Sequence, residues 1–150
     1  MEKRTAEPIS IESKIISLEL VSFNVETLPS TKKAKLDSNQ FAFEFNVSAD
    51  IDSKNKLIKL VSVIKIYSDS SKKLFLGEIE SKGSFLLENY NDLKRESDGA
   101  IPNVVVSTFI GVILSTTRGF LILKSKGTII DGSILPLIDM GSLLLNSNSK

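Results

Sequence analysis

The stretch IPNVVVSTFIGVILSTTRGFLILKSK, residues 101 to 126, decides the fold. Pro102 suits the first turn of a helix, because its φ is already helical and its missing N–H would have no partner there. No further proline follows before Lys126, and apolar residues recur on nearly every side of the helix. A helix that is apolar all round must be buried on more than one side, so we expect its second face in a subunit interface. The residues expected in that interface are Ile110, Ile113, Leu114, Thr117 and Leu121.

The same stretch is long enough to cross a membrane. Residues 104 to 123 would cover a bilayer core of about 30 Å at a rise of about 1.5 Å per residue. The five serine and threonine residues of this stretch would be tolerable in lipid, but Arg118 opposes the reading, because a charge at mid-span costs roughly 3 kcal/mol. We therefore expect a core helix and no membrane insertion.

Composition narrows the class of protein. The length of 150 residues favours a single domain over residues 1 to 150, with residues 1 to 8 disordered and a polar tail at 146 to 150. The net charge of +1 argues against electrostatically driven nucleic-acid binding. The chain has no cysteine and no histidine, which excludes disulfides, thiol nucleophiles and zinc sites built from soft ligands. The start lacks the apolar segment of a signal peptide, so we expect a cytoplasmic protein.

The first half of the chain alternates like a β-sheet. Residues 9 to 25 form a strand whose apolar set changes face, from Ile16, Leu18 and Leu20 to Val21, Phe23 and Val25, and such a switch predicts a bulge or bend. Strands at 41 to 51, 57 to 67 and 74 to 87 follow after short turns, which requires antiparallel neighbours. The order of elements predicts an α+β fold, in which the long helix packs across a four-stranded antiparallel sheet with a bent first strand and then a meander.

Two glycines and one strip of aromatic residues stand out in these strands. Gly77 and Gly83 share the inward phase of the last strand, which indicates the close approach of another backbone or a second bulge. Phe41, Phe43 and Phe45 alternate at strand spacing and indicate sheet core.

The sequence offers few candidate catalytic residues. Asp131 with Asp139, and Asp50 with Asp52, could act as carboxylate pairs, but Asp at turns is typical of local backbone hydrogen bonding. Residues 127 to 132 lack the lysine and the preceding strand of a phosphate-binding loop. We expect no enzyme, no catalytic residue, no metal site and no cofactor.

The segment STTRGFLILKSKGTIIDGSILPLIDMGSLL, beginning at Ser115, resembles the end of the SecB family of export chaperones and its SecB-like relatives. Lys126-Gly127-Thr128 and Ile134-Leu135-Pro136-Leu137 look like the helix end and the proline-containing loop of that family. The resemblance implies a short C-terminal helix after this loop. It also implies a homotetramer or homodimer with the long helices in the interface, and ATP-independent binding of unfolded clients in apolar grooves.

The chain departs from the family in its charge and its terminus. The export chaperone is acidic and ends in a metal-binding tail that docks on the translocase motor, whereas this chain ends in residues 146 to 150, NSNSK. Whether the translocase motor is a partner is therefore left undecided by the sequence. Some SecB-like relatives serve antitoxins instead, so an adaptor for one partner, such as an antitoxin or a phage component, is the alternative function. A carrier of a small apolar ligand is a third.

Residues 128 to 140 are unusually apolar for a loop. Their apolar side chains either pack as core or wall a client groove, and as a group they are our first choice for client contact. The basic cluster of Lys32, Lys33 and Lys35 is most simply a solvated loop, and Arg118 either pairs with an acid in the interface or reaches solvent. The residues expected to bind clients are Ile129, Ile130, Ile134, Leu135, Leu137 and Ile138, with Phe75, Phe85 and Tyr90 at the groove edge.

Overall fold

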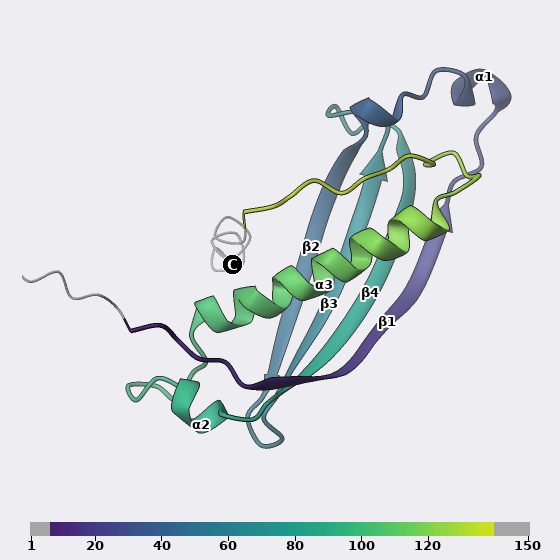
Figure 1. The fold of residues 1–150 in the computed structure, drawn as a ribbon. Helices are drawn as coiled ribbons and strands as arrows, with labels where there is room; N and C mark the ends of the chain where they lie inside the picture. Colours follow the sequence, from purple (N-terminus) through teal and green to yellow (C-terminus); the bar gives the residue numbers. More distant parts are fainter. Residues whose placement is uncertain (1–6, 140–150) are drawn as a thin grey trace, which may run out of the picture.

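A four-stranded sheet and one long helix form two layers in the computed structural model, which describes residues 7 to 139 (Figure 1). The helix crosses one face of the sheet diagonally, and the α+β class predicted from the sequence is confirmed. The strands are β1 (Ser13–Val25), β2 (Ala42–Asp52), β3 (Leu57–Tyr67) and β4 (Phe75–Leu87). The helices are α1 (Ser30–Lys33), η1 (Ser38–Gln40), α2 (Tyr90–Leu93) and α3 (Asn103–Lys124).

The strand order is β1-β4-β3-β2, with every neighbouring pair antiparallel. Strands β2, β3 and β4 form the expected meander, and β1 lies beside β4. The connection after β1 must therefore pass from one edge of the sheet to the other, and it carries α1 and η1 on the way. We call residues 26 to 41 the crossover connection, because it forms one wall of the site described below.

The bulge predicted in β1 is present, and its effect on the side chains differs from the expectation. The pairing of β1 with β4 shifts between Ile15 and Ser17 and again between Leu20 and Ser22. The second shift inserts one residue, so Phe23 and Val25 stay on the core side with Leu20 and do not turn to the opposite face. The first shift leaves Ile16 exposed.

The close backbone approach predicted at the glycines of β4 is confirmed at Gly77. A Cβ at this position would lie 2.7 Å from the carbonyl oxygen of Asn24 on β1. At Gly83 the nearest atoms belong to the side chains of Leu18 and Phe85, at 3.0 and 3.1 Å, and these have more freedom to move. Gly77 therefore sets how closely the two strands approach.

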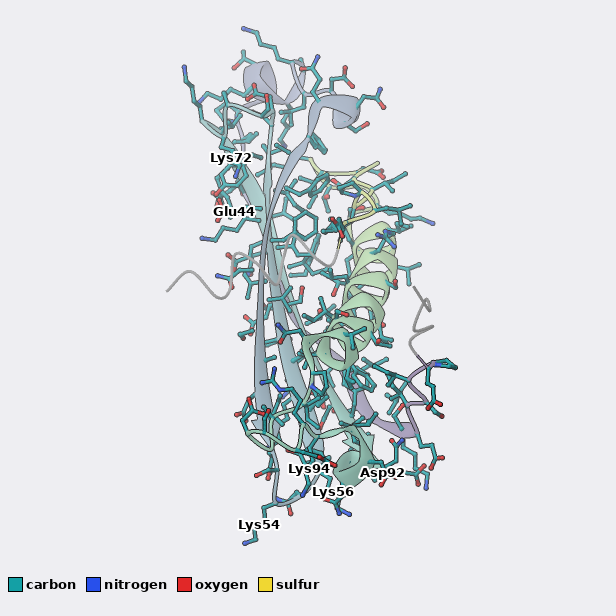
Figure 2. The ribbon with its side chains drawn as sticks, turned by 90° about the vertical axis from the view of Figure 1, so that its left-hand side faces the viewer. Glu44, Lys54, Lys56, Lys72, Asp92 and Lys94 are labelled. Atoms are coloured by element: carbon teal, nitrogen blue, oxygen red, sulfur yellow. The ribbon has the colours of Figure 1, made fainter. Side chains whose placement is uncertain are left out.

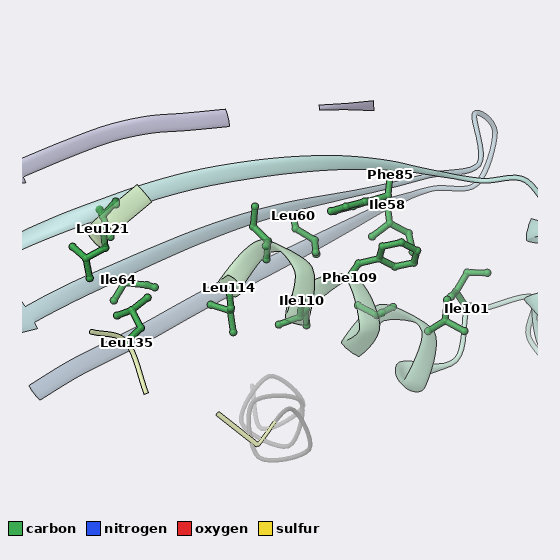
Figure 3. Close-up of a cluster of buried hydrophobic side chains, with 14 of the residues drawn as sticks. Ile58, Leu60, Ile64, Phe85, Ile101, Phe109, Ile110, Leu114, Leu121 and Leu135 are labelled. Carbon is green, nitrogen blue, oxygen red and sulfur yellow. The ribbon is translucent and has the colours of Figure 1, made fainter. Parts of the chain in front are cut away.

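One side of α3 makes the core with the sheet. Figure 3 shows Phe109 beside Phe85 and Ile58, and Leu121 beside Ile64. The rings of Phe85 and Phe109 lie 4.7 Å apart between centroids. The helix residues buried on this side are Val105, Val106, Phe109, Ile110, Ile113, Leu114, Thr117 and Leu121.

This packing corrects the expected subunit interface. The five residues predicted there are all buried within the chain itself, with at most 5% of their surface exposed. A surface that is already covered cannot also face a second subunit. The residues in question are Ile110, Ile113, Leu114, Thr117 and Leu121.

The opposite side of α3 is open and almost uncharged. It presents Val104, Thr108, Gly111 and Ser115, and its later turns expose Ile122 and Leu123, of which Leu123 is 68% exposed. The helix has the length and apolar composition of a membrane span, yet nearly half of its most apolar window is buried in the fold. Its uncharged outer side is what made the helix look apolar all round.

After α3 the chain folds back as turns. Residues 125 to 139, which we call the post-helix loop, cross the helix-covered face of the sheet toward β2 (Figure 1). The described part of this loop contains no helix. The rest of the segment predicted to form a short C-terminal helix lies outside the described residues, as does the polar tail at 146 to 150.

Candidate functional site

A pocket of about 400 Å³ opens where the crossover connection meets the post-helix loop. Three half-buried apolar side chains line it, Leu36 and Phe41 from the connection and Ile129 from the loop. Its volume falls within the range of roughly 300–1,000 Å³ found for ligand sites. The remaining lining residues are Lys33, Ser38, Gly127, Thr128 and Asp131.

Local turns fix the loop wall of this pocket. The N–H of Gly127, at φ +75°, donates to a carboxylate oxygen of Asp131 at 2.9 Å, and the N–H of Asp131 donates to the carbonyl of Thr128 at 3.1 Å. Between them the fully buried side chain of Ile130 anchors the loop in the core. The two walls also meet directly, because a Cβ at Gly132 would lie 3.1 Å from Oγ of Ser38. The pocket is therefore built by contacts within one chain.

Further along the loop, Arg118 of α3 holds the main chain. Its Nε donates to the carbonyl oxygen of Leu135 and its Nη2 to that of Pro136, both at 3.0 Å. Leu135 is buried, while Ile134 and Leu137 on either side are 66% and 90% exposed. Arg118 thus neither pairs with an acid nor simply reaches solvent.

The predicted client-binding residues divide into two groups. Ile134 and Leu137 are exposed on the loop, and Ile129 and Ile138 are half-buried beside the core. The prediction is corrected for four others, because their side chains are core: Ile130, Leu135, Phe85 and Tyr90.

Phe75 also lies elsewhere than predicted. Its ring stands edge-on to that of Tyr67, with 5.8 Å between the centroids. The register of β3 with β4 shifts at this point, so Leu76 is buried and Phe75 is only partly covered. Phe75 therefore belongs to the end of the sheet and not to the pocket lining.

Sequence reasoning missed the wall that the crossover connection supplies. Lys33, Leu36 and Ser38 lie in a polar segment without periodicity, and Phe41 was assigned to the sheet core. One available signal was Leu36, the only large apolar residue between Pro29 and Phe41. Such an isolated apolar residue in a polar connection indicates an anchor point.

Two of the carboxylates that the sequence offered for acid–base chemistry, Asp52 and Asp131, are engaged in turns. Within residues 7 to 139, no group of three Asp, Glu, His or Cys side chains could hold a metal ion. Asp131 accepts from the N–H of Gly127 as described, and Asp52 accepts from the side chain of Asn55 at 2.8 Å and from its N–H at 3.0 Å. The bonds from Asn55 hold the pKa of Asp52 below its ordinary value. Both carboxylates stabilise turns.

Two solved structures are similar in fold to this chain. Over 85% of this chain and 91% of the other, the structure superposes on the Mycobacterium tuberculosis SecB-like chaperone Rv1957, solved in complex with a ChAD peptide from the HigA1 antitoxin, at TM-score 0.52 and 9% identity. The fold is SecB-like. A Streptococcus agalactiae protein of unknown function is more distant, at TM-score 0.40 and 10% identity over 87% of this chain and all of the other. Neither a protein-family model nor a curated protein sequence matches the chain. The SecB-like relationship therefore concerns the fold alone.

Proposed function

We propose that this protein is an ATP-independent chaperone that holds non-native polypeptides against the post-helix loop. The observation that carries the proposal is the exposure of Ile134 and Leu137 on either side of a buried anchor, Leu135. A client that covered these side chains, which are 66% and 90% exposed, would remove their apolar surface from water. The SecB-like fold supports the same reading.

The physical basis is burial of apolar surface without sequence-specific contacts. Each square ångström of apolar surface removed from water contributes about 25 cal/mol, so several modest contacts along an extended client add up. Leu36, Phe41 and Ile129 in the pocket lining offer apolar contacts for one bulky side chain, and Ile134 and Leu137 offer further contacts on the same loop. Burial of this kind needs no nucleotide.

The test is suppression of aggregation of an unfolded test protein at equimolar chaperone. Changing Ile134 and Leu137 together to Ser should weaken the suppression while oligomeric mass and unfolding midpoint hold. Ile9→Ser is the matched control, because Ile9 is 54% exposed but lies before β1. Loss of folding in the double variant would instead assign these residues to the core, and unchanged suppression would reject the site.

An adaptor for one partner is the second candidate. It is favoured by the neighbour Rv1957, which was solved with a peptide from an antitoxin. The two functions differ in breadth. A chaperone captures several unrelated unfolded proteins with similar affinity, whereas an adaptor yields one tight partner in a pull-down and leaves their aggregation unchanged.

We further propose that the protein forms a homodimer or homotetramer through the outer side of α3. Apart from Arg118 this side is uncharged until Lys124, and it exposes Val104, Ile122 and Leu123. Molecular mass by light scattering tests the assembly, since Ser115→Glu should give a folded monomer.

The proposed location is the cytoplasm, where transfer of clients to an export translocase would be one use of the activity.

A further inference from the structure

Strand β2 forms one edge of the sheet and pairs only with β3 among the described strands. It is 11 residues long, about twice the usual length of a strand. Figure 2 views the sheet from the side on which β2 lies in Figure 1, and Glu44 of β2 lies there beside Lys72, at 3.5 Å between the charged atoms. Within residues 7 to 139, no main-chain hydrogen bond from a turn or loop reaches β2. The described chain therefore leaves the outer edge of β2 without a neighbouring strand.

The two edge strands differ in how they are protected against pairing. Strand β1 carries Lys14 and shifts twice in its register with β4. Strand β2 contains neither lysine nor proline, and its register with β3 is continuous from Ala42 to Asp52. Lysines, prolines and bulges are the devices by which edge strands avoid unwanted partners. Because β2 has none of them, its edge is suited to an added strand.

The inward side of β2 is covered less completely than that of β3. Phe45 is half-buried, whereas Ile64 opposite it on β3 is fully buried. Toward the hairpin, Ile51 is 37% exposed although its β3 partner Ile58 is fully buried. The helix α3 packs mainly on β1, β3 and β4, so its cover falls away across a single strand. Apolar side chains of an added strand would bury this surface beside β2.

The charges of β2 oppose its pairing with a second copy of itself. Antiparallel pairing of two β2 strands over their full length would place Glu44 opposite Asp50 of the second copy, twice across the two-fold axis. Like charges directly opposite each other destabilise a sheet. Asp50 is exposed and forms no ion pair within residues 7 to 139, and its cross-strand neighbour Lys59 pairs with Asp52 instead, at 3.9 Å. The edge therefore favours a different chain with Lys or Arg opposite these carboxylates.

We infer that β2 binds an extended client segment as a fifth strand of the sheet. The segment alternates apolar residues, which lie beside the inward side of β2, with outward residues that include Lys or Arg. Main-chain hydrogen bonds give such a strand affinity that does not depend on its sequence, and the alternation gives selectivity. The inference rests on the proposed function, because it adds a contact for the same clients, and the post-helix loop crosses this face of the sheet toward β2 (Figure 1).

N-methylated peptides test the main-chain pairing, because successive N–H groups of an extended strand point to opposite edges. The parent is a fluorescent heptapeptide, Val-Lys-Val-Lys-Val-Lys-Val, whose dissociation constant is measured by anisotropy. One derivative is N-methylated at its three lysines, and the other at its last three valines. One of the two should bind about tenfold more weakly than the parent, and the other should stay within about threefold. Equal affinities of the two derivatives would overturn the inference.

A peptide with Glu in place of its three lysines tests the charge of the partner. It should bind about fivefold more weakly than the parent at 0.1 M salt, because its carboxylates would lie opposite those of β2. Glu44→Gln with Asp50→Asn should remove the difference between the two peptides. Equal binding of both peptides to the unchanged protein would overturn the preference for Lys or Arg.

A lysine placed in the edge strand tests the location. Ala49 is exposed and shares the inward phase of Phe45 and Ile51, so Ala49→Lys should fold and weaken binding of the parent peptide about tenfold. Val21→Lys is the matched control, because Val21 is 47% exposed on β1, at the opposite edge of the sheet. It changes the net charge equally and should leave binding unchanged. If the two variants bind the peptide alike, the edge of β2 is not the site.

The outcomes separate this inference from the proposed function. A protein that suppresses aggregation of the test protein but binds both methylated derivatives alike is a chaperone without strand pairing. Absence of binding by the parent peptide would overturn the inference as well, whatever the aggregation assay shows. Failure of the proposed function appears instead as unchanged aggregation of the test protein.

Discussion

The guanidinium of Arg118 is joined to the carbonyl oxygen of Leu135 by a hydrogen bond of 3.0 Å that spans 17 residues of sequence. A second bond of the same length reaches the carbonyl of Pro136. Within residues 7 to 139, no other hydrogen bond reaches residues 134 to 138. Arg118 therefore fixes the part of the loop that carries the exposed Ile134 and Leu137, by bridging two successive carbonyls with its planar fork.

We predict that Arg118→Ala loosens the loop without unfolding the protein. Each hydrogen bond contributes about 1 kcal/mol net, and Arg118 is only half-buried, so the unfolding midpoint should fall slightly. Limited proteolysis of residues 134 to 138 should accelerate, and client affinity should drop about fivefold. Arg118→Lys should recover little, because a point charge cannot form the fork.

The matched control is Arg95→Ala, which removes an exposed pair with Asp98 in a distant loop. It should leave both the proteolysis of residues 134 to 138 and client affinity unchanged. Unaltered proteolysis of this segment in Arg118→Ala would contradict the positioning role.

Ser62 and Ser81 face each other across β3 and β4, and we predict opposite effects from the same substitution. The hydroxyl of Ser81 is hydrogen-bonded to that of Thr117, whereas the buried Ser62 Oγ has no partner among the described residues. Ser62→Ala should therefore stabilise by about 1 kcal/mol, and Ser81→Ala should destabilise by about 1 kcal/mol. Urea unfolding measures both. A destabilised Ser62→Ala would indicate that a bound water satisfies the hydroxyl.

Glycine-to-alanine changes should have opposite effects on stability in the helix α3 and in the strand β4. At Gly111 and Gly119 a new Cβ meets nothing within 4 Å, so each change should stabilise the isolated chain by up to about 1 kcal/mol through helix propensity. At Gly77 the Cβ would strike the carbonyl of Asn24 at 2.7 Å, and the same change should lower the thermal midpoint. A stabilised Gly77→Ala would show that β1 and β4 can move apart freely.

Acid should weaken the loop around Asp98. The backbone N–H of Ala100, and then Arg95, hold the pKa of Asp98 below its ordinary value of 3.8. A lowered carboxyl pKa gives stability that is present above the unfolded pKa and is lost as pH falls through the folded pKa. The urea midpoint should therefore decline below about pH 4, and Asp98→Asn should flatten that decline. Asp50→Asn, at an exposed carboxylate on β2, should not.

Local periodicity was sufficient to predict the four strands and the long helix, but not the short helices α1, η1 and α2. The strand expected at 57 to 67 is β3 with the same bounds, and the helix expected from Asn103 begins there. The bulge in β1 was visible because one extra residue shifts an alternating pattern. The alternation could not say which face each half of β1 would keep, because that depends on the pairing with β4.

The sequence by itself determined the four strands, the long helix, their antiparallel arrangement and an apolar loop after the helix, because each follows from spacing along the chain. Only the tertiary structure decided which side of α3 is buried, since its two sides differ little in charge, and a periodic pattern carries no direction in space. It also decided that Ile130 and Leu135 are core while Ile134 and Leu137 are exposed. The pocket could be recognised only from the tertiary structure, because its lining residues Lys33 and Gly127 lie 94 positions apart in the sequence and no local pattern links them.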